Sequence, residues 1–313
     1  MKKILKWLGY TLLGLLALVL CTAAYLQFSA FPTYPVKAPT LTITPDSARL
    51  AQGKRIVMTD CAHCHRGPDG KLSGDLWFDD PSAGKMFTAN ITQHPTAGIG
   101  QYTDGELAYL LRTGIKRNGH FAGPWMTFPL MSDEDVASVI AFLRSDAPPV
   151  QASERRQPPH ETTLLGKAFL KMFLKPTIQY PEKPILAPDT TDKIAYGRYL
   201  ATGLWECYRC HSASFETNND LIPEQSAGYF GGGNPVTNKE NLLALSANIT
   251  PDKETGIGNW TEAQFSDAVR FGKRPDGTAL SPIMPPMAVL TDPEVSALWA
   301  YLKTVPALHH PVR

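Results

Sequence analysis

The first 28 residues contain the longest apolar run in the chain. It extends from Trp7 to about Phe28, and no charged residue occurs between Lys6 and Lys37. Because about 20 apolar residues suffice to cross a bilayer, the run predicts a transmembrane helix whose preceding lysines stay in the cytoplasm. The chain after about residue 30 would then lie on the other side of the membrane.

A cleaved signal peptide is the alternative for the same run. Its cleavage site would be Cys21–Ala23 or Phe28–Ala30, and both are poor matches to the usual small-x-small pattern. A lipoprotein signal at Cys21 is disfavoured because bulky Leu20 precedes it. Cys21 is therefore interpreted as a small apolar residue of an uncleaved anchor.

Beyond the anchor, apolar positions with helical spacing occur in two similar stretches, each predicting three helices. The first helix of each stretch is predicted at 47–59 and at 192–202. The second opens on a capping box, Thr103 with Glu106 and Thr261 with Gln264. The third begins at Ser132 and at Thr291, and its apolar stripe in the first stretch is Val136, Val139, Ile140 and Leu143.

Sequence words repeat along with the helices. Ala89–Thr92 recurs as Ala247–Thr250, and Gly98–Thr103 recurs in similar form as Gly256–Thr261, each 158 positions later. Such self-similarity predicts one domain present twice. The second copy holds about twelve extra residues, which we place around 229–235, where Gly231–Gly233 predicts a flexible turn.

Each copy contains one Cys-x-x-Cys-His motif, at Cys61–His65 and Cys207–His211. This is the attachment signature of a c-type haem, in which two cysteines bond to the porphyrin and the adjoining histidine reaches the iron. Two motifs predict two covalently bound haem c groups and hence electron transfer. The predicted attachment residues are Cys61, Cys64, Cys207 and Cys210, with His65 and His211 as iron ligands.

Two other uses of these cysteines fit the sequence less well. One structural zinc would take four Cys or His ligands, but the two pairs stand 146 positions apart and a histidine adjoins each. A thioredoxin-like dithiol requires a βαβ context, which the pattern does not show.

Charge and length limit the possible partners and the number of domains. Without the three N-terminal lysines the chain carries 27 basic and 29 acidic residues, which argues against nucleic-acid binding. The roughly 280 residues after the anchor are comfortable for two domains. Four cysteines used for haem leave no disulfide framework.

A helix before the motif, one after it and a closing helix resemble the class I cytochrome c fold, in which the first and last helices cross over the haem. We therefore predict an all-α chain of two tandem class I cytochrome c domains after a transmembrane helix. The boundaries are 1–28 for the anchor, 29–45 for a linker, 46–147 for domain 1, 148–189 for a proline-rich linker and 190–308 for domain 2.

In that fold a methionine ahead of the last helix, often followed by proline, is the sixth iron ligand. Met126 and Met284 lie 158 positions apart, as the other repeated words do, and we predict them as the ligands. The competitors Met131 and Met287 pair at that spacing with Val289 and Pro129. His120 is a further competitor in the first copy, but its counterpart is Thr278, so we interpret it as a loop histidine.

Four other repeated residues are candidates for the haem surroundings: Asn90, Asn248, Tyr102 and Trp260. Such groups donate to propionates or pack on the porphyrin edge. Asn before Ile-Thr also favours a turn, so a role in loop structure is equally compatible with the repetition.

The linker contains one further amphipathic segment, Glu161–Lys175, predicted as a short helix. Leu165, Phe169, Met172 and Phe173 would share a face. The segment is interpreted either as a helix packed across the two domains or as a surface on the membrane or a partner.

Gly197–Leu200 leading into Cys207–His211, and Asn248–Asp252 leading into Thr255–Thr261, resemble the multihaem cytochrome c subunits of membrane-bound alcohol and gluconate dehydrogenases. Members of that group carry three haem motifs, and this chain carries two. The resemblance implies a periplasmic cytochrome, held by one pass in the inner membrane. It would accept electrons from a dehydrogenase and pass them to quinone, a terminal oxidase or a soluble cytochrome of a respiratory chain.

Two other functions stay open beside the electron carrier, which needs no substrate chemistry of its own. A dihaem enzyme, such as a peroxidase or a thiosulfate-type dehydrogenase, would need an open or unusual axial position on one iron. A structural tether would hold haem domains near an oxidase without a donor. The presence of both Met126 and Met284 favours the carrier.

Overall fold

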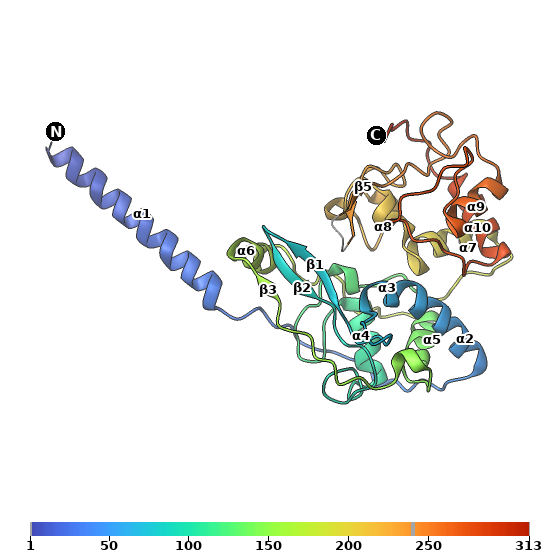
Figure 1. Ribbon diagram of the computed structural model, residues 1–313, viewed down its shortest axis with the longest axis horizontal. Coiled ribbons are helices and arrows are strands. Elements are labelled where there is room, and N and C mark those ends of the chain that lie inside the picture. Colours follow the sequence, from blue (N-terminus) through green and yellow to red (C-terminus); the bar gives the residue numbers. More distant parts are fainter. Residues whose placement is uncertain (1, 239–241, 313) are drawn as a thin grey trace.

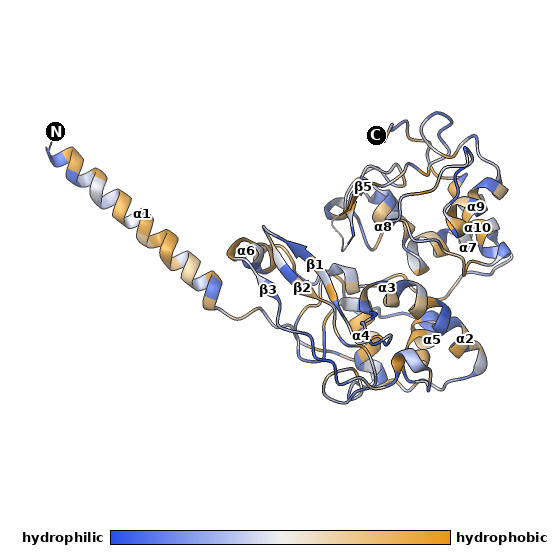
Figure 2. Cartoon of the chain, in the orientation of Figure 1, coloured by the Kyte–Doolittle hydropathy of each residue, from blue (hydrophilic) through white to orange (hydrophobic). Residues whose placement is uncertain are grey.

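The computed structural model describes residues 2–238 and 242–312. Its first element, α1 (Lys2–Phe28), extends away from the rest of the molecule as a single helix of 27 residues (Figure 1). Apolar residues occur along its length (Figure 2), and it is long and apolar enough to cross a membrane. At a rise of about 1.5 Å per residue it exceeds the roughly 30 Å hydrocarbon core. The predicted N-terminal helix is confirmed.

Two helix pairs form the centres of the two repeated units. In the first unit α2 (Ser47–Ile56) packs on α5 (Asp133–Leu143), and in the second α7 (Lys193–Tyr199) packs on α10 (Asp292–Leu302). Each pair crosses at a glycine, because a Cβ on Gly53 or Gly197 would meet backbone of the opposite helix. The remaining helices of the units are α3 (Ala62–His65), α4 (Asp104–Thr113), α8 (Cys207–His211) and α9 (Glu262–Phe271).

The predicted helix starts are confirmed by their caps. Thr103 and Thr261 each form the reciprocal hydrogen bonds of a capping box, and Ser132 caps α5. The box of Thr291 with Glu294 is also present. Each box satisfies backbone N–H groups that the first helical turn leaves without partners.

A π-helical turn interrupts the helix that leads to each Cys-x-x-Cys-His motif. These turns are η1 (Val57–Cys61) and η4 (Leu200–Leu204), where the sequence predicted ordinary helix. In the second unit Trp205 and Glu206 follow the turn, and Glu206 adopts a left-handed conformation with φ of 46°. The second motif is therefore reached by a sharper bend than the first.

Two small sheets correct the all-α prediction. The first unit has a hairpin of β1 (Leu76–Asp80) and β2 (Gly84–Phe87), which β3 (Glu161–Thr162) extends in the order β1-β2-β3. The second unit has the antiparallel pair β4 (Pro235–Thr237) and β5 (Leu243–Leu245). The structure remains mostly helical, and the strands are too short to produce a strong alternating pattern in the sequence.

The extra residues of the second unit lie earlier than the sequence predicted. Gly74 N–H donates to the His65 carbonyl at 2.8 Å, and Gly232 N–H donates to the His211 carbonyl at 2.7 Å, so these two glycines are equivalent. Both have positive φ and lie against backbone that a Cβ would strike. Leu72 and Phe230 are equivalent as well, since their carbonyls accept from Ile91 N–H and Ile249 N–H, so the insertion falls between His211 and Phe230. Phe230 is fully buried, and Gly231 and Gly232 directly after it are buried as well.

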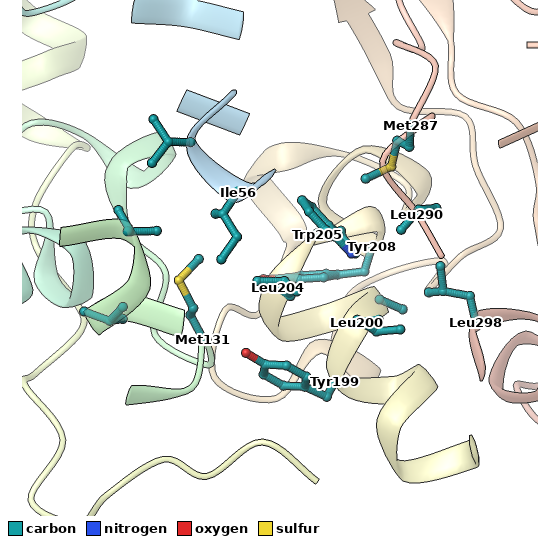
Figure 3. Close-up of a cluster of buried hydrophobic side chains, with 14 of the residues drawn as sticks. Ile56, Met131, Tyr199, Leu200, Leu204, Trp205, Tyr208, Met287, Leu290 and Leu298 are labelled. Atoms are coloured by element: carbon teal, nitrogen blue, oxygen red, sulfur yellow. The ribbon is translucent and has the colours of Figure 1, made fainter. Parts of the chain in front are cut away.

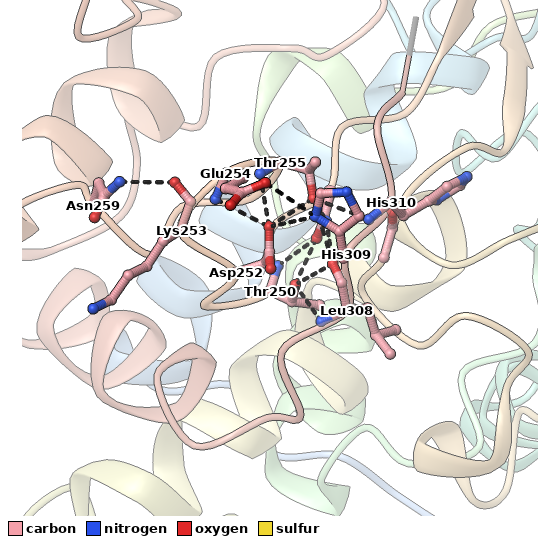
Figure 4. A network of polar contacts seen from close by, with 11 residues as sticks. Thr250, Asp252, Lys253, Glu254, Thr255, Asn259, Leu308, His309 and His310 are labelled. Carbon is pink, nitrogen blue, oxygen red and sulfur yellow. Dashed lines mark hydrogen bonds and ion pairs between the residues drawn. The ribbon is translucent and has the colours of Figure 1, made fainter.

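The segments after α5 and α10 pack back on their own units, against the repeated Asn-Ile-Thr loops. Ser153 N–H donates to Thr92 Oγ1 at 3.1 Å, and Leu308 N–H donates to Thr250 Oγ1 at 3.2 Å. The second of these clamps continues to Thr255 and His310 (Figure 4). Residues 148–157 of the predicted linker thus pack on the first unit, and only the part after them runs on to α6 (Leu164–Met172).

The two units share one apolar core and two reciprocal polar contacts. Ile56, Met131, Leu204 and Tyr208 are among the buried residues at the junction (Figure 3). Arg55 at the end of α2 binds Glu294 in the first turn of α10 at 2.6 Å. The Tyr199 hydroxyl, at the end of α7, donates to Asp135 in the first turn of α5. The end of each first helix therefore meets the start of the other unit's last helix.

Candidate haem sites

The two motif histidines are held in the same way in both units. The side-chain Nδ1 of His65 lies 2.7 Å from the Ala89 carbonyl, and that of His211 lies 2.8 Å from the Ala247 carbonyl. A carbonyl only accepts, so Nδ1 carries the proton and Nε2 keeps its lone pair. Burial lowers the pKa of both imidazoles and keeps them neutral. Each histidine is thus prepared to bind a metal through Nε2, with its ring fixed by a second hydrogen bond.

The four motif cysteines are partly buried thiols without a disulfide. Burial raises the pKa of the Cys61 and Cys207 thiols to about 12, and burial also raises the pKa of Cys64 and Cys210. A thiolate site for zinc or redox exchange requires the opposite shift. Across residues 2–238 and 242–312, no three His, Cys, Asp or Glu side chains converge as they would around a bare metal ion.

The methionines predicted as sixth ligands occupy matching turns. Met126 N–H donates to the Gly123 carbonyl at 3.1 Å, and Met284 N–H donates to the Ser281 carbonyl at 3.0 Å. Both side chains are partly exposed in loops ahead of the last helix. The backbone hydrogen bonds therefore place Met126 and Met284 at equivalent positions of the two units, as the repeat spacing predicted.

The competing methionines lie in the core. Met131 is 2% exposed and Met287 is 8% exposed. Their hydrogen bonds show that the spacing has grown to 159 by this point, since Met131 N–H donates to Phe128 and Leu290 N–H donates to Met287. The sequence pairing of Met131 with Val289 and of Met287 with Pro129 is therefore one residue off, whereas the choice of Met126 and Met284 is unaffected.

His120 lies in a small loop of the first unit, where its backbone bridges to Thr33 and its carbonyl accepts from Lys116 at 2.9 Å. The equivalent loop of the second unit is closed by a bridge between Lys273 and Ala279. The placement agrees with the interpretation of His120 as a loop histidine.

The repeated asparagines hold loops. Asn90 donates to the carbonyls of Ser153 and Arg155 at 2.8 and 2.9 Å, and its Oδ1 accepts from Thr92. Asn248 donates to Leu308 and to Thr255 in the same manner. With both N–H groups of each amide engaged, these contacts support the loop-structural alternative over donation to a propionate.

Tyr102 and Trp260 pack at the edge of the core, partly buried. The guanidinium of Arg117 lies 5.4 Å from the centre of the Tyr102 ring, and burial raises the pKa of the Tyr102 hydroxyl. Both side chains pack on the protein core, and packing on a porphyrin edge stays a prediction for them.

Arg209, a variable position of the second motif, is a site residue that sequence reasoning missed. Its guanidinium donates to the Pro124 and Thr127 carbonyls at 2.9 and 2.7 Å, on either side of Met126. It also pairs with Glu206 at 3.1 Å and Asp220 at 3.4 Å. The second motif therefore holds the ligand loop of the first unit directly. A charged residue inside the motif was the one available signal.

The acidic residues that precede the two motifs, Asp60 and Glu206, interact electrostatically. Burial, with smaller contributions from the charges of Asp220 and Asp60, raises the pKa of Glu206 to about 8 despite Arg209. Asp60 directly precedes Cys61, so the approaches to the two motifs are near enough to interact electrostatically.

The donor set fits haem c. Each unit offers two neutral thiols one helical turn apart, a histidine with a free Nε2 and a thioether in a loop ahead of its last helix. Thiols add across vinyl groups, and imidazole with thioether is an axial pair of c-type cytochromes.

Comparison with known proteins gives the same answer. The cytochrome c family model matches residues 50–146. The chain is 32% identical to the fructose dehydrogenase cytochrome subunit of Gluconobacter japonicus, over 87% of this chain and 56% of that protein. It is 29% identical to the cytochrome c subunit of the alcohol dehydrogenase (quinone) of Gluconacetobacter polyoxogenes, over 89% and 61%. It is 27% identical to a diheme cytochrome c-type protein of Cereibacter sphaeroides, over 94% and 97%.

The chain spans little more than half the length of these two dehydrogenase subunits and nearly all of the diheme cytochrome. The resemblance to cytochrome c subunits of dehydrogenases, first drawn from the repeated motifs, is confirmed. Residues 50–146 are a cytochrome c domain, and the chain is a homologue of the cytochrome c subunits of dehydrogenases and of a diheme cytochrome c.

Proposed function

We propose that this chain binds two haem c groups and carries electrons between a dehydrogenase and a quinone, a terminal oxidase or a soluble cytochrome. Each bound haem iron supplies a reversible one-electron change. His65 and Met126 would hold one iron, and His211 and Met284 the other. The observation that supports this most strongly is the repeated bond from His Nδ1 to a backbone carbonyl, which prepares both imidazoles for iron.

The protein's part is to keep both axial positions filled and the haem surroundings rigid. The Ala89 and Ala247 carbonyls fix the imidazoles, and the one-turn loops present the methionines. A filled sixth position favours electron transfer over binding of substrate to iron. This arrangement supports the carrier over a peroxidase-like enzyme.

The axial assignment is tested by four variants that form two matched pairs. Met126→Leu and Met284→Leu should each abolish one methionine–iron(III) charge-transfer band in the oxidised protein. The core substitutions Met131→Leu and Met287→Leu should leave both bands in place. Loss of a band in a core variant, or ready cyanide binding by the unsubstituted protein, would contradict the proposal.

The haem count has its own test. Intact mass spectrometry should show two haem groups retained after denaturation. Cys61→Ser with Cys64→Ser should lower that count by one, as should Cys207→Ser with Cys210→Ser. A single haem in the unsubstituted protein would rule out the dihaem assignment.

The dehydrogenase partner and the location are proposed from the relatives and from α1. The relatives include cytochrome subunits of fructose, alcohol and gluconate dehydrogenases. We infer domains at 46–147 and 190–308 in the periplasm, held to the inner membrane by α1. Intact mass should include residues 1–28, and detergent should be needed for extraction. A protein that begins near residue 24 or 31 would show that the segment is a cleaved signal.

A further inference from the structure

The helix α6 in the linker exposes apolar side chains and partly covers lysines, the opposite of a helix packed on the surface of a soluble protein. Its exposed positions are apolar: Leu165 is 68%, Phe169 49% and Phe173 67% exposed. Lys167 and Lys171 are instead partly covered. Large apolar side chains gathered on an outer surface indicate that something apolar covers them.

The two lysines attach α6 to the end of α1. Lys171 donates to the Leu26 carbonyl at 3.1 Å and to the carbonyl and hydroxyl of Ser29, each at 2.6 Å. Lys167 donates to Gln27. These oxygens belong to the last turn of α1 and to Ser29 directly after it, where carbonyls lack helical partners and the helix dipole favours a cation. Figure 1 shows α6 beside the end of α1.

The other side of α6 is fixed to the first haem-motif unit. Gly166 packs so tightly on the β1–β2 turn that a Cβ would strike the Ala83 carbonyl. Thr163 caps α6 and its backbone N–H donates to Ala83 at 3.1 Å. Because α6 is held from both sides, it sets the orientation of the first unit relative to α1.

The depth of α6 follows from the length of α1. About 20 residues fill the hydrocarbon core, so a span that begins at Trp7 ends near Leu26, the residue that Lys171 contacts. Helix α6 therefore lies at the level of the lipid headgroups. An apolar cavity of about 440 Å³ adjoins it, and Trp77, Trp125 and Phe169 are among its lining residues. Tryptophan is enriched at this level of membrane proteins.

We propose that α6 lies in the outer leaflet interface, with Leu165, Phe169, Met172 and Phe173 in contact with lipid. The occupant of this face is a lipid surface because the face is continuous with the end of a membrane-spanning helix. The proposal rests on the anchor role of α1. Trp125 lines the cavity beside α6 and directly precedes Met126, so this placement of α6 also makes the first proposed haem site the one nearer the membrane.

The test is spin labelling of the full haem-loaded chain in phosphatidylcholine–phosphatidylglycerol vesicles. In a Cys21→Ser background, Phe169→Cys carries the label on α6, and Leu186→Cys, at a position 80% exposed in the linker, is the matched control. We expect oxygen to relax the label at 169 more than a water-soluble nickel chelate does, and the reverse order at 186. Retained haem absorbance verifies folding of both variants.

Two results would overturn the proposal. Equal chelate accessibility at 169 and 186 would place α6 in water. Exclusion of both reagents at 169 would show that protein covers this face, either a partner or a second copy. Failure of the anchor itself is distinguishable, because the chain would then remain in the supernatant when the vesicles are sedimented.

Discussion

Replacement of Arg209 is expected to damage both units at once. The side chain is 14% exposed, pairs with Glu206 and Asp220 in the second unit, and donates to two carbonyls of the Met126 loop in the first. Arg209→Met keeps most of the volume and removes the charge. It leaves the Pro124 and Thr127 carbonyls without these donors and Glu206 without its cation.

The expected cost is about 3–5 kcal/mol, the range for breaking a buried ion pair by removing one partner. Protonation of Glu206 offsets part of this, because the pKa of that carboxyl is already about 8 and rises further without Arg209. The loss should therefore be greater above pH 8 than below it. The matched control is Arg198→Met, whose pair with Glu224 is 47% and 37% exposed and is expected to contribute less than about 1 kcal/mol.

Two measurements on each variant test whether Arg209 links the two sites. Denaturant midpoints followed by far-ultraviolet circular dichroism give the loss of stability, with the slope checked because two domains need not unfold together. The charge-transfer band expected from the proposed Met126–haem bond reports the loop. If Arg209→Met matched Arg198→Met in both, the proposed link between the two sites would be refuted.

Three further predictions concern the junction and the helix crossings. Arg55→Gln should lower the free energy of unfolding by about 1.5–3 kcal/mol in a denaturant titration, because the side chain of Glu294 is 4% exposed. Arg49→Gln, in a more exposed pair with Glu134, should lower it less. Gly53→Ala should cost about 1–3 kcal/mol by forcing α2 away from α5, seen as a lower thermal midpoint. Burial raises the pKa of Asp60 from 3.8 to about 7, so the stability that this group contributes is full below pH 3.8 and is lost as the pH rises to about 7. Asp60→Asn should remove this decrease from the pH dependence of the urea midpoint. An unchanged pH dependence would contradict this cause.

The sequence was informative wherever the signal was local or repeated. The capping boxes at Thr103, Thr261 and Thr291 are present, since a box is a contact between residues three apart. The repeat spacing identified Met126 and Met284 as equivalent without any knowledge of contacts. Their backbone hydrogen bonds in the structure repeat at that same spacing.

Features that depend on distant contacts were missed or misplaced. The β1–β2 and β4–β5 hairpins are too short for an alternating pattern to distinguish them from loops. The insertion was assigned to the glycine run because glycine usually marks a turn. Gly232 instead has the role of Gly74, which is visible only from the hydrogen bonds that both make to a motif histidine. The role of Arg209 depends on a loop 82 residues away.

The reciprocal contacts at the junction explain why the two motifs are neighbours. Arg55 and Tyr199 lie at the ends of the first helices, and each binds the third residue of the other unit's last helix. Such an exchange of equivalent contacts is the pattern of an approximate two-fold interface. Each motif follows directly from the end of its first helix, so both motifs are brought toward the axis. The departures from symmetry, Glu206 with positive φ and Arg209 across the junction, lie at this same place. Electron exchange between the two proposed haems would thus occur in a fixed geometry, with the Met126 loop of the first unit held by Arg209 of the second motif.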